Sequence, residues 1–380
     1  MRAGRAVLLA DAGDAGPSAG SVPVGPSKLT VDRSSRWSNG ALSLGIVAAV
    51  VLAVLPFGAG ASVINQLTQL FVLALLAVGW NLLAGYGGMV SIGQQCFVGL
   101  GSYAVLYLAQ HGVLAWYAVP IAVIGAGVIS IPISYVAFRL RGGYFAIGMW
   151  VTAEVFRLTI AQVQSLGGGA GASLNDLSNY SPTTRDHITY WVGLALVVLT
   201  LFAAGLLLRS RIGLALMSVR DDERAAEASG VNIVRTKRVV FVISAAICGG
   251  AGTLLIISNL QVQPDASFSV QYSAFMIFMV LVGGMGTFEG PLVGALVFFG
   301  LQQALSSYGV WYLVIVGSVA VAVTVWLPAG IWGTFDPRRR RSIVPLRHRV
   351  DYGDLVVPAT TARPGATRDA RGPAPTPGER

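Results

Sequence analysis

The sequence predicts an all-α protein, a polytopic transmembrane helical bundle of about ten helices, and three observations support this fold class. First, 54% of the residues are hydrophobic and only 11% are charged, whereas soluble proteins carry about 25% charged residues. Second, apolar runs recur along the chain. Their length is close to the roughly 20 residues that a helix needs to cross a bilayer. Third, residues 37–138 contain no Asp, Glu, Lys or Arg.

The chain divides into a membrane domain, residues 37–336, and two polar tails. Residues 1–36 are rich in Gly, Ala, Ser and Pro and are predicted to form a disordered N-terminal tail. Residues 337–380 combine Pro with many Arg and are predicted to form a basic cytoplasmic tail. The net charge of +9 comes almost entirely from Arg. In a membrane protein this excess favours a role in topology and lipid contact over nucleic-acid binding.

The membrane domain contains ten apolar segments. Two of them, 91–110 and 269–286, are Gly-rich at one end, which permits a broken or re-entrant helix where protein covers the freed backbone. The tripeptide Gly-Gly-Met occurs at both 87–89 and 283–285, which alone is weak evidence for an internal duplication. The ten segments are 41–59, 64–86, 91–110, 114–137, 144–164, 189–208, 239–260, 269–286, 290–306 and 310–328.

The distribution of basic residues predicts the topology, because Lys and Arg concentrate in cytoplasmic loops. Basic clusters precede the first segment and follow the fourth, the sixth and the tenth. A single even–odd assignment therefore places every cluster, and both termini, in the cytoplasm. The clusters are Lys28 with Arg33 and Arg36, Arg139 with Arg141, the loop 209–238, and Arg338–Arg341.

The loop 209–238 carries seven Lys/Arg and four Asp/Glu, so it is predicted to be an aqueous loop between two spans. Its centre, Asp221–Gly230, has acids in the first turn, then alanines, and a glycine at the end, which predicts a short helix. Small side chains would let a partner protein approach closely, while the charges would fix its orientation. The alternative is a solvated surface helix without a partner.

Several polar side chains lie inside apolar segments, where burial without a partner is costly. Ser91, Gln94 and Gln95 follow a Gly-rich stretch that permits either local unwinding around a substrate or tight helix packing. Glu154 and Arg157 are spaced to pair on one helix face. Ionisable residues within a span are functional or paired, so both a pathway role and a structural ion pair remain open.

The sequence contains no set of residues that favours an enzyme. Cys96 and Cys248 are isolated in apolar segments, and the three His are far apart, so neither a metal nor a cofactor is expected. The Gly-x-x-x-x-Gly-Lys-[Ser/Thr] phosphate loop is missing from the sequence. The chain is therefore not expected to bind ATP in the usual way.

Five ordered blocks resemble the integral-membrane permease family of branched-chain amino acid ABC importers. The chain departs from the family pattern at Gln95 and Cys96, where two alanines are usual, and at Met149, where threonine is usual. The blocks are Asn81–Tyr103, Arg139–Arg157, Gly167–Gly171 with the later Pro264 and Phe268, Arg220–Gly230, and Val280–Ala295.

The resemblance implies three groups of functional residues. A coupling helix that docks on an ATPase subunit would comprise Arg220, Asp222, Glu223, Ala225, Ala226, Glu227 and Gly230. A translocation pathway would be lined by Gly88, Ser91, Gly93, Gln94, Gln95, Glu154 and Arg157. A delivering binding protein would contact Gly167, Gly168 and Gly171.

The predicted function is that of a permease subunit of an ABC importer for branched-chain or related apolar amino acids, in the cytoplasmic membrane of a prokaryote. The implied partners are a second homologous permease, two cytoplasmic ABC ATPases, an extracytoplasmic substrate-binding protein and membrane lipid. Two alternatives remain. The extra amide of Gln95 mildly favours a urea or short-amide importer, and an ion-coupled secondary transporter would use Glu154 as its one clear intramembrane acid.

Overall fold

The computed structural model describes residues 30–32, 45, 47, 49–58, 60–177, 179–305, 308–309, 311–327, 329–335 and 349–351. The chain forms two compact units, one of Ser34–Leu346 and one of both chain ends. In the unit of the chain ends, β1 (Thr30–Asp32) pairs antiparallel with β4 (Arg349–Asp351). The remainder of the two predicted tails lies outside the described residues.

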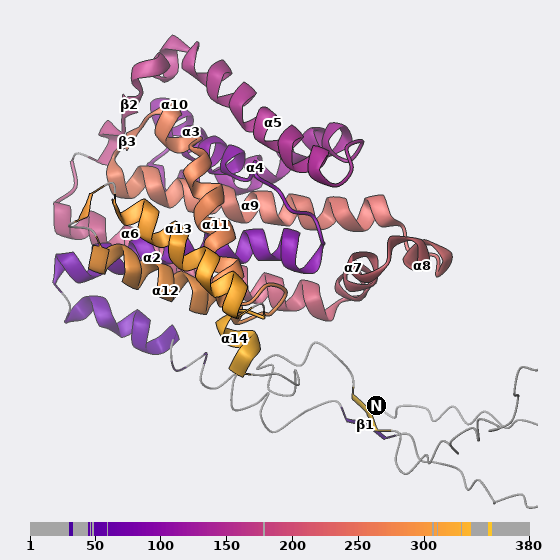
Figure 1. The fold of residues 1–380 in the computed structure, drawn as a ribbon. Helices are drawn as coiled ribbons and strands as arrows, with labels where there is room; N and C mark the ends of the chain where they lie inside the picture. Colours follow the sequence, from indigo (N-terminus) through magenta and orange to yellow (C-terminus); the bar gives the residue numbers. More distant parts are fainter. Residues whose placement is uncertain are drawn as a thin grey trace, which may run out of the picture. The chain divides into compact units, whose positions relative to one another are not determined.

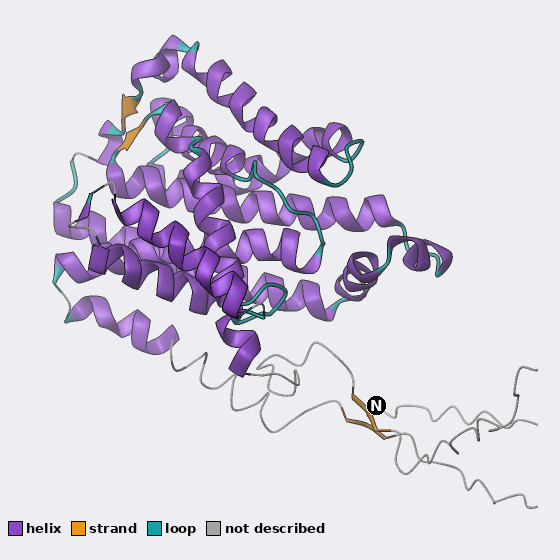
Figure 2. Ribbon diagram, in the orientation of Figure 1, coloured by secondary structure: helices purple, strands orange, loops and turns teal. Residues whose placement is uncertain are grey.

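The larger unit consists mainly of helices, which confirms the predicted all-α polytopic fold (Figures 1 and 2). Within the described residues, seven helical stretches are long and apolar enough to cross a membrane. The first predicted segment is helical at residues 45, 47 and 49–57. The other nine correspond to α2 (Ala61–Asn81), α3 (Gln95–Gln110), α4 (Ala115–Ala137), α5 (Gly143–Ala161), α6 (Pro182–Arg209), α9 (Ile233–Asn259), α11 (Val270–Gly283), α12 (Gly290–Leu305) and α13 (Trp311–Trp326).

Helices α2 and α9 form the centre of the bundle. In the apolar stretches of these two helices, 83% and 78% of the residues are buried. In α5 and α6 only 28% are buried, so these helices lie at the outside of the bundle. Glycine allows α9 to approach α3 at backbone contact, since a Cβ atom on Gly252 would lie 2.0 Å from the Val98 carbonyl oxygen. The Ser102 hydroxyl, in turn, donates to the Gly252 carbonyl at 2.8 Å. Close packing with interhelical hydrogen bonds is the usual way that membrane helices associate.

The chain leaves the α-helical conformation between α2 and α3, at the Gly-rich start of the predicted segment 91–110, and the rest of that segment is the continuous helix α3. The last turn of α2 widens into the π-turn η2 (Leu82–Tyr86), the chain then runs irregularly to Gln94, and α3 begins at Gln95. The indole N–H of Trp80 donates to the Ser91 carbonyl at 2.8 Å and holds the irregular stretch against α2. Most of this stretch is buried by protein, as non-helical backbone at membrane depth requires.

The end of the bundle that carries β2 (Ala172–Ser173) and β3 (Gln261–Val262) is formed by the long connections after α5 and α9. The two strands pair antiparallel, and the short helix α10 (Pro264–Ser267) leads from β3 toward α11. Asp176, in the connection after β2, accepts a hydrogen bond from the Ala115 N–H at 2.9 Å and so caps α4. This end of the bundle lies opposite the polar segment after α6 (Figure 1).

The polar segment 209–238 is almost entirely helical, which differs from the single short helix that the sequence predicts. Helix α6 ends at Arg209, α7 (Arg211–Asp221) follows after one residue, and α8 (Glu223–Ala228) follows after one more. Ser210 separates the first two, because its hydroxyl accepts from the N–H groups of Ile212 at 3.2 Å and Gly213 at 3.4 Å. Serine at this position is a strong N-cap.

Candidate functional site

Helix α8 is held in place by a cap at each end. The Asp222 carboxylate accepts from the N–H groups of Arg224 at 2.8 Å and Ala225 at 3.1 Å. Gly230 ends the helix in the left-handed conformation with φ of 82°, and Val231 N–H donates back to the Ala226 carbonyl at 3.1 Å. The predicted helix at Asp221–Gly230 therefore exists, with bounds Glu223–Ala228 and with the predicted glycine at its end, while the cap by Asp222 was not predicted.

The faces of α8 differ from the sequence-based expectation in one respect. The alanines were expected to share a partner-facing surface, but Ala226 is 3% exposed and packs against its own chain. Ala225 and Glu227 are exposed. Glu223 forms an ion pair with Lys237 at the start of α9, which ties α8 to the bundle. A partner can therefore reach Ala225 and Glu227, while Ala226 anchors the helix.

Arg220 faces inward rather than toward a partner. Its Nη1 donates to the Gly85 carbonyl in η2 at 2.9 Å, and its Nη2 donates to Asp221 at 3.0 Å. The Gly88 backbone lies against the same side chain, because a Cβ atom on Gly88 would be 3.3 Å from Arg220 Cγ. This residue thus connects α7 to the irregular stretch that follows α2.

Asn81, which sequence reasoning did not single out, joins the end of α2 to the loop between α11 and α12. Its Oδ1 accepts from the Gly286 N–H at 2.9 Å, and its Nδ2 donates to the Thr287 carbonyl at 2.9 Å. A Cβ atom on Gly85 would lie 2.6 Å from Gly286 N, so the two loops touch at their backbones. We name Asn81, Gly85, Arg220 and Gly286 the loop junction. An Asn at the end of the apolar run Phe71–Trp80 was the sequence signal that could have identified it.

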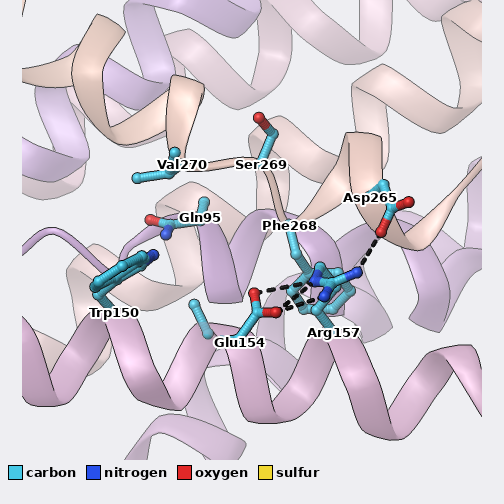
Figure 3. Close-up of a pocket in the computed structure, with 9 residues that line it drawn as sticks. Gln95, Trp150, Glu154, Arg157, Asp265, Phe268, Ser269 and Val270 are labelled. Carbon is cyan, nitrogen blue, oxygen red and sulfur yellow. Dashed lines mark hydrogen bonds and ion pairs between the residues drawn. The ribbon is translucent and has the colours of Figure 1, made fainter.

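The predicted pathway residues divide between two ends of the bundle. Gly88 lies at the loop junction, whereas Gln95, Glu154 and Arg157 line one cavity of about 280 Å³ near α10 (Figure 3). Ser91, Gly93 and Gln94 lie between the two and do not line this cavity. Gln94 is fully buried, and neither end of its carboxamide has a hydrogen-bond partner among the described residues.

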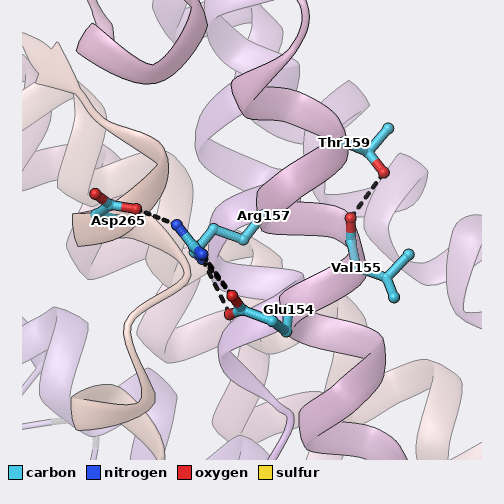
Figure 4. A network of polar contacts seen from close by, with 5 residues as sticks. All are labelled: Glu154, Val155, Arg157, Thr159 and Asp265. Atoms are coloured by element: carbon cyan, nitrogen blue, oxygen red, sulfur yellow. Dashed lines mark hydrogen bonds and ion pairs between the residues drawn. The ribbon is translucent and has the colours of Figure 1, made fainter.

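The cavity is charged on one side. Arg157 Nε donates to both carboxylate oxygens of Glu154 at 3.0 Å, one helical turn away on α5. The Nη1 of Arg157 donates to Asp265 on α10, a residue 108 positions further along the chain (Figure 4). The sequence predicts the Glu154–Arg157 pair, which is confirmed, but not Asp265. Long-range partners of this kind leave no signal in local spacing.

The three glycines expected to contact a binding protein all have left-handed backbones, with φ of 91° at Gly167, 56° at Gly168 and 83° at Gly171. A Cβ atom on Gly171 would also lie 2.2 Å from the Val262 carbonyl oxygen of β3. The conformation of the connection explains why glycine occupies these positions. Contact with a binding protein remains a prediction.

Comparison with known proteins places these features in a family. Residues 62–325 match the family model described as "branched-chain amino acid transport system / permease component". This chain belongs to that permease family. The chain is accordingly a multi-pass membrane protein of a transport system rather than an enzyme.

Named permeases support the assignment. The high-affinity branched-chain amino acid transport system permease protein LivM of Escherichia coli is 29% identical over 314 residues, which cover 75% of this chain and 74% of LivM. LivH of Salmonella typhimurium is 29% identical over 68% of this chain and 91% of its own length. BraD of Pseudomonas aeruginosa is 28% identical over 71% of this chain and 94% of its own length.

Proposed function

We propose that this chain is the permease subunit of an ABC importer that moves branched-chain or related apolar amino acids across the cytoplasmic membrane, with both termini in the cytoplasm. ATP hydrolysis by two partner ATPases drives the transport. A second homologous permease completes the pore, and an extracytoplasmic binding protein delivers the substrate. Membership of the permease family and the names of the related proteins support this proposal.

The observation that carries the ATP-driven mechanism is the connection from α8 to the loop junction. Helix α8 presents exposed side chains that a partner can contact. A movement of α8 would displace the adjoining α7, whose Arg220 is hydrogen-bonded to the Gly85 carbonyl. Gly85 and Gly286 are in backbone contact, so a displacement of α7 would act both on the stretch after α2 and on the loop between α11 and α12. A bistable packing of this kind can be biased by nucleotide in a partner.

The test is uptake of radiolabelled leucine into proteoliposomes that contain this chain, its second permease, the ATPases and the binding protein. We expect uptake that requires hydrolysable ATP and that excess valine, but not urea, suppresses. Uptake suppressed by urea and not by valine would assign the chain to a short-amide importer instead.

A further inference from the structure

The cavity near α10 combines an apolar half with a charged half. Its walls come from the start of α3, the middle of α5, α10, and the turn from α10 into α11 (Figure 3). The volume of about 280 Å³ lies near the lower limit of ordinary small-ligand pockets, which run from roughly 300 Å³ upward. The lining residues are Gln95, Trp150, Ala153, Glu154, Arg157, Asp265, Phe268, Ser269 and Val270.

The charged half holds one cation between two anions. Arg157 is 26% exposed and is held by Glu154 on its own helix, while Asp265 approaches it from α10. Because the Asp265 side chain is 78% exposed, its ion pair with Arg157 is worth little and can open at small cost. A carboxylate from a ligand can replace Asp265 on Arg157 without changing the charge balance around the guanidinium.

The remaining walls suit the other parts of an amino acid. Glu154 supplies an acceptor for an ammonium group, and Trp150, Phe268 and Val270 provide apolar surface for an aliphatic side chain. The Oε1 of Gln95 accepts from the Ser273 hydroxyl, and its carboxamide points toward the Trp150 side of the cavity (Figure 3). Helices α3 and α11 both begin at the cavity, and the positive ends of helix dipoles favour a carboxylate.

We propose that this cavity is a binding site for the zwitterionic head group of an apolar α-amino acid and that the Arg157–Asp265 ion pair closes it. The ligand carboxylate displaces Asp265 from Arg157, the ammonium group pairs with Glu154, and the side chain lies against Trp150. Helix α10, which contributes Asp265 to the cavity, lies with β2 and β3 at the end of the bundle opposite α7 and α8 (Figure 1). The site therefore receives the substrate before the loop junction does. This inference rests on the proposed function.

The test uses a cysteine at Val270, which is 48% exposed and lines the cavity. The two native cysteines are buried and give little background. The complete complex without binding protein is reconstituted in proteoliposomes and treated with a membrane-impermeant maleimide. Leucine at about ten times its dissociation constant for the permease complex is expected to slow the labelling of Val270→Cys about tenfold. Ser173→Cys, exposed on β2, is the control and should label at the same rate with and without leucine.

Ligand analogues and second substitutions separate recognition from simple packing. Leucinamide lacks the carboxylate and isocaproate lacks the ammonium group, so neither is expected to protect. Arg157→Lys should abolish protection by leucine at the same concentration, because lysine cannot hold two carboxylates in the planar geometry of a guanidinium. Asp265→Asn should raise the labelling rate without leucine, because it loosens the closing ion pair.

Two results distinguish a failure here from a failure of the proposed function. If the complex with binding protein shows ATP-driven leucine uptake while leucine leaves Val270→Cys labelling unchanged, the site is refuted. If leucine protects but no ATP-driven uptake occurs, the site stands and the ABC mechanism is refuted.

Discussion

Replacing Asn81 by alanine tests whether the loop junction holds the end of α2 against the loop between α11 and α12. Asn81 is 3% exposed, and its carboxamide makes two hydrogen bonds of 2.9 Å, one with each of the neighbours Gly286 and Thr287. Alanine leaves the Gly286 N–H and the Thr287 carbonyl without these partners. Gly286 and Thr287 are half-buried, so water can replace part of each lost interaction. A net hydrogen bond contributes about 0.5–1.5 kcal/mol, so the free energy of unfolding should fall by about 1–3 kcal/mol for the two.

This loss is large against the roughly 5–15 kcal/mol that separates folded from unfolded states of ordinary domains. The measurement is denaturant unfolding of the purified chain in detergent, followed by tryptophan fluorescence. Asn65→Ala is the matched control, because the Asn65 carboxamide is exposed and makes one long hydrogen bond of 3.4 Å to Asp186. Its effect should stay within about 0.5 kcal/mol. Equal unfolding curves for the two variants would refute the junction.

Three further predictions concern the polar segment and the topology. Ala225→Trp should leave folding intact but lower ATP-driven uptake, because the indole would block the partner. Ala226→Trp should lower the midpoint of denaturant unfolding, because Ala226 is 3% exposed. Equal unfolding midpoints for the two variants would contradict this difference. Asp222→Ala removes the cap of α8 and should destabilise this helix by about 0.5–2 kcal/mol. The amide hydrogens of α8 should therefore exchange faster in the variant than in the wild type. Cysteine at Ser218 should react with impermeant maleimide only from the cytoplasm and cysteine at Ser173 only from outside; labelling of both from one side would overturn the topology.

The helices themselves could be predicted from the sequence, because apolar length and the position of arginines depend on local composition. All ten apolar segments contain helix, and the glycine expected to end α8, Gly230, is where the sequence places it. The break before α3 was allowed by its glycines, but the sequence left open whether the segment was broken or re-entrant. The contact of the Trp80 indole with the Ser91 carbonyl gives the stretch its path.

The parts that could not be predicted depend on contacts between distant segments. Arg220 has the family spacing of a coupling residue, yet its guanidinium contacts Gly85, 135 positions earlier in the chain. Asp265 reaches Arg157 only because β2 and β3 pair and bring α10 to α5. Likewise, the burial of Ala226 depends on how α8 packs, and alanine is compatible with either an exposed or a buried face.

The most direct test of the central claim, that ATP hydrolysis on partner subunits drives this permease, is the energy source for uptake. Proteoliposomes with the complete complex are loaded with ATP, treated with proton and sodium ionophores, and given leucine with its binding protein. We predict concentrative leucine uptake that persists without any ion gradient and stops when ATP is replaced by a non-hydrolysable analogue. Uptake that ionophores abolish, and that proceeds without ATP when an ion gradient is imposed, would contradict the account and indicate a secondary transporter.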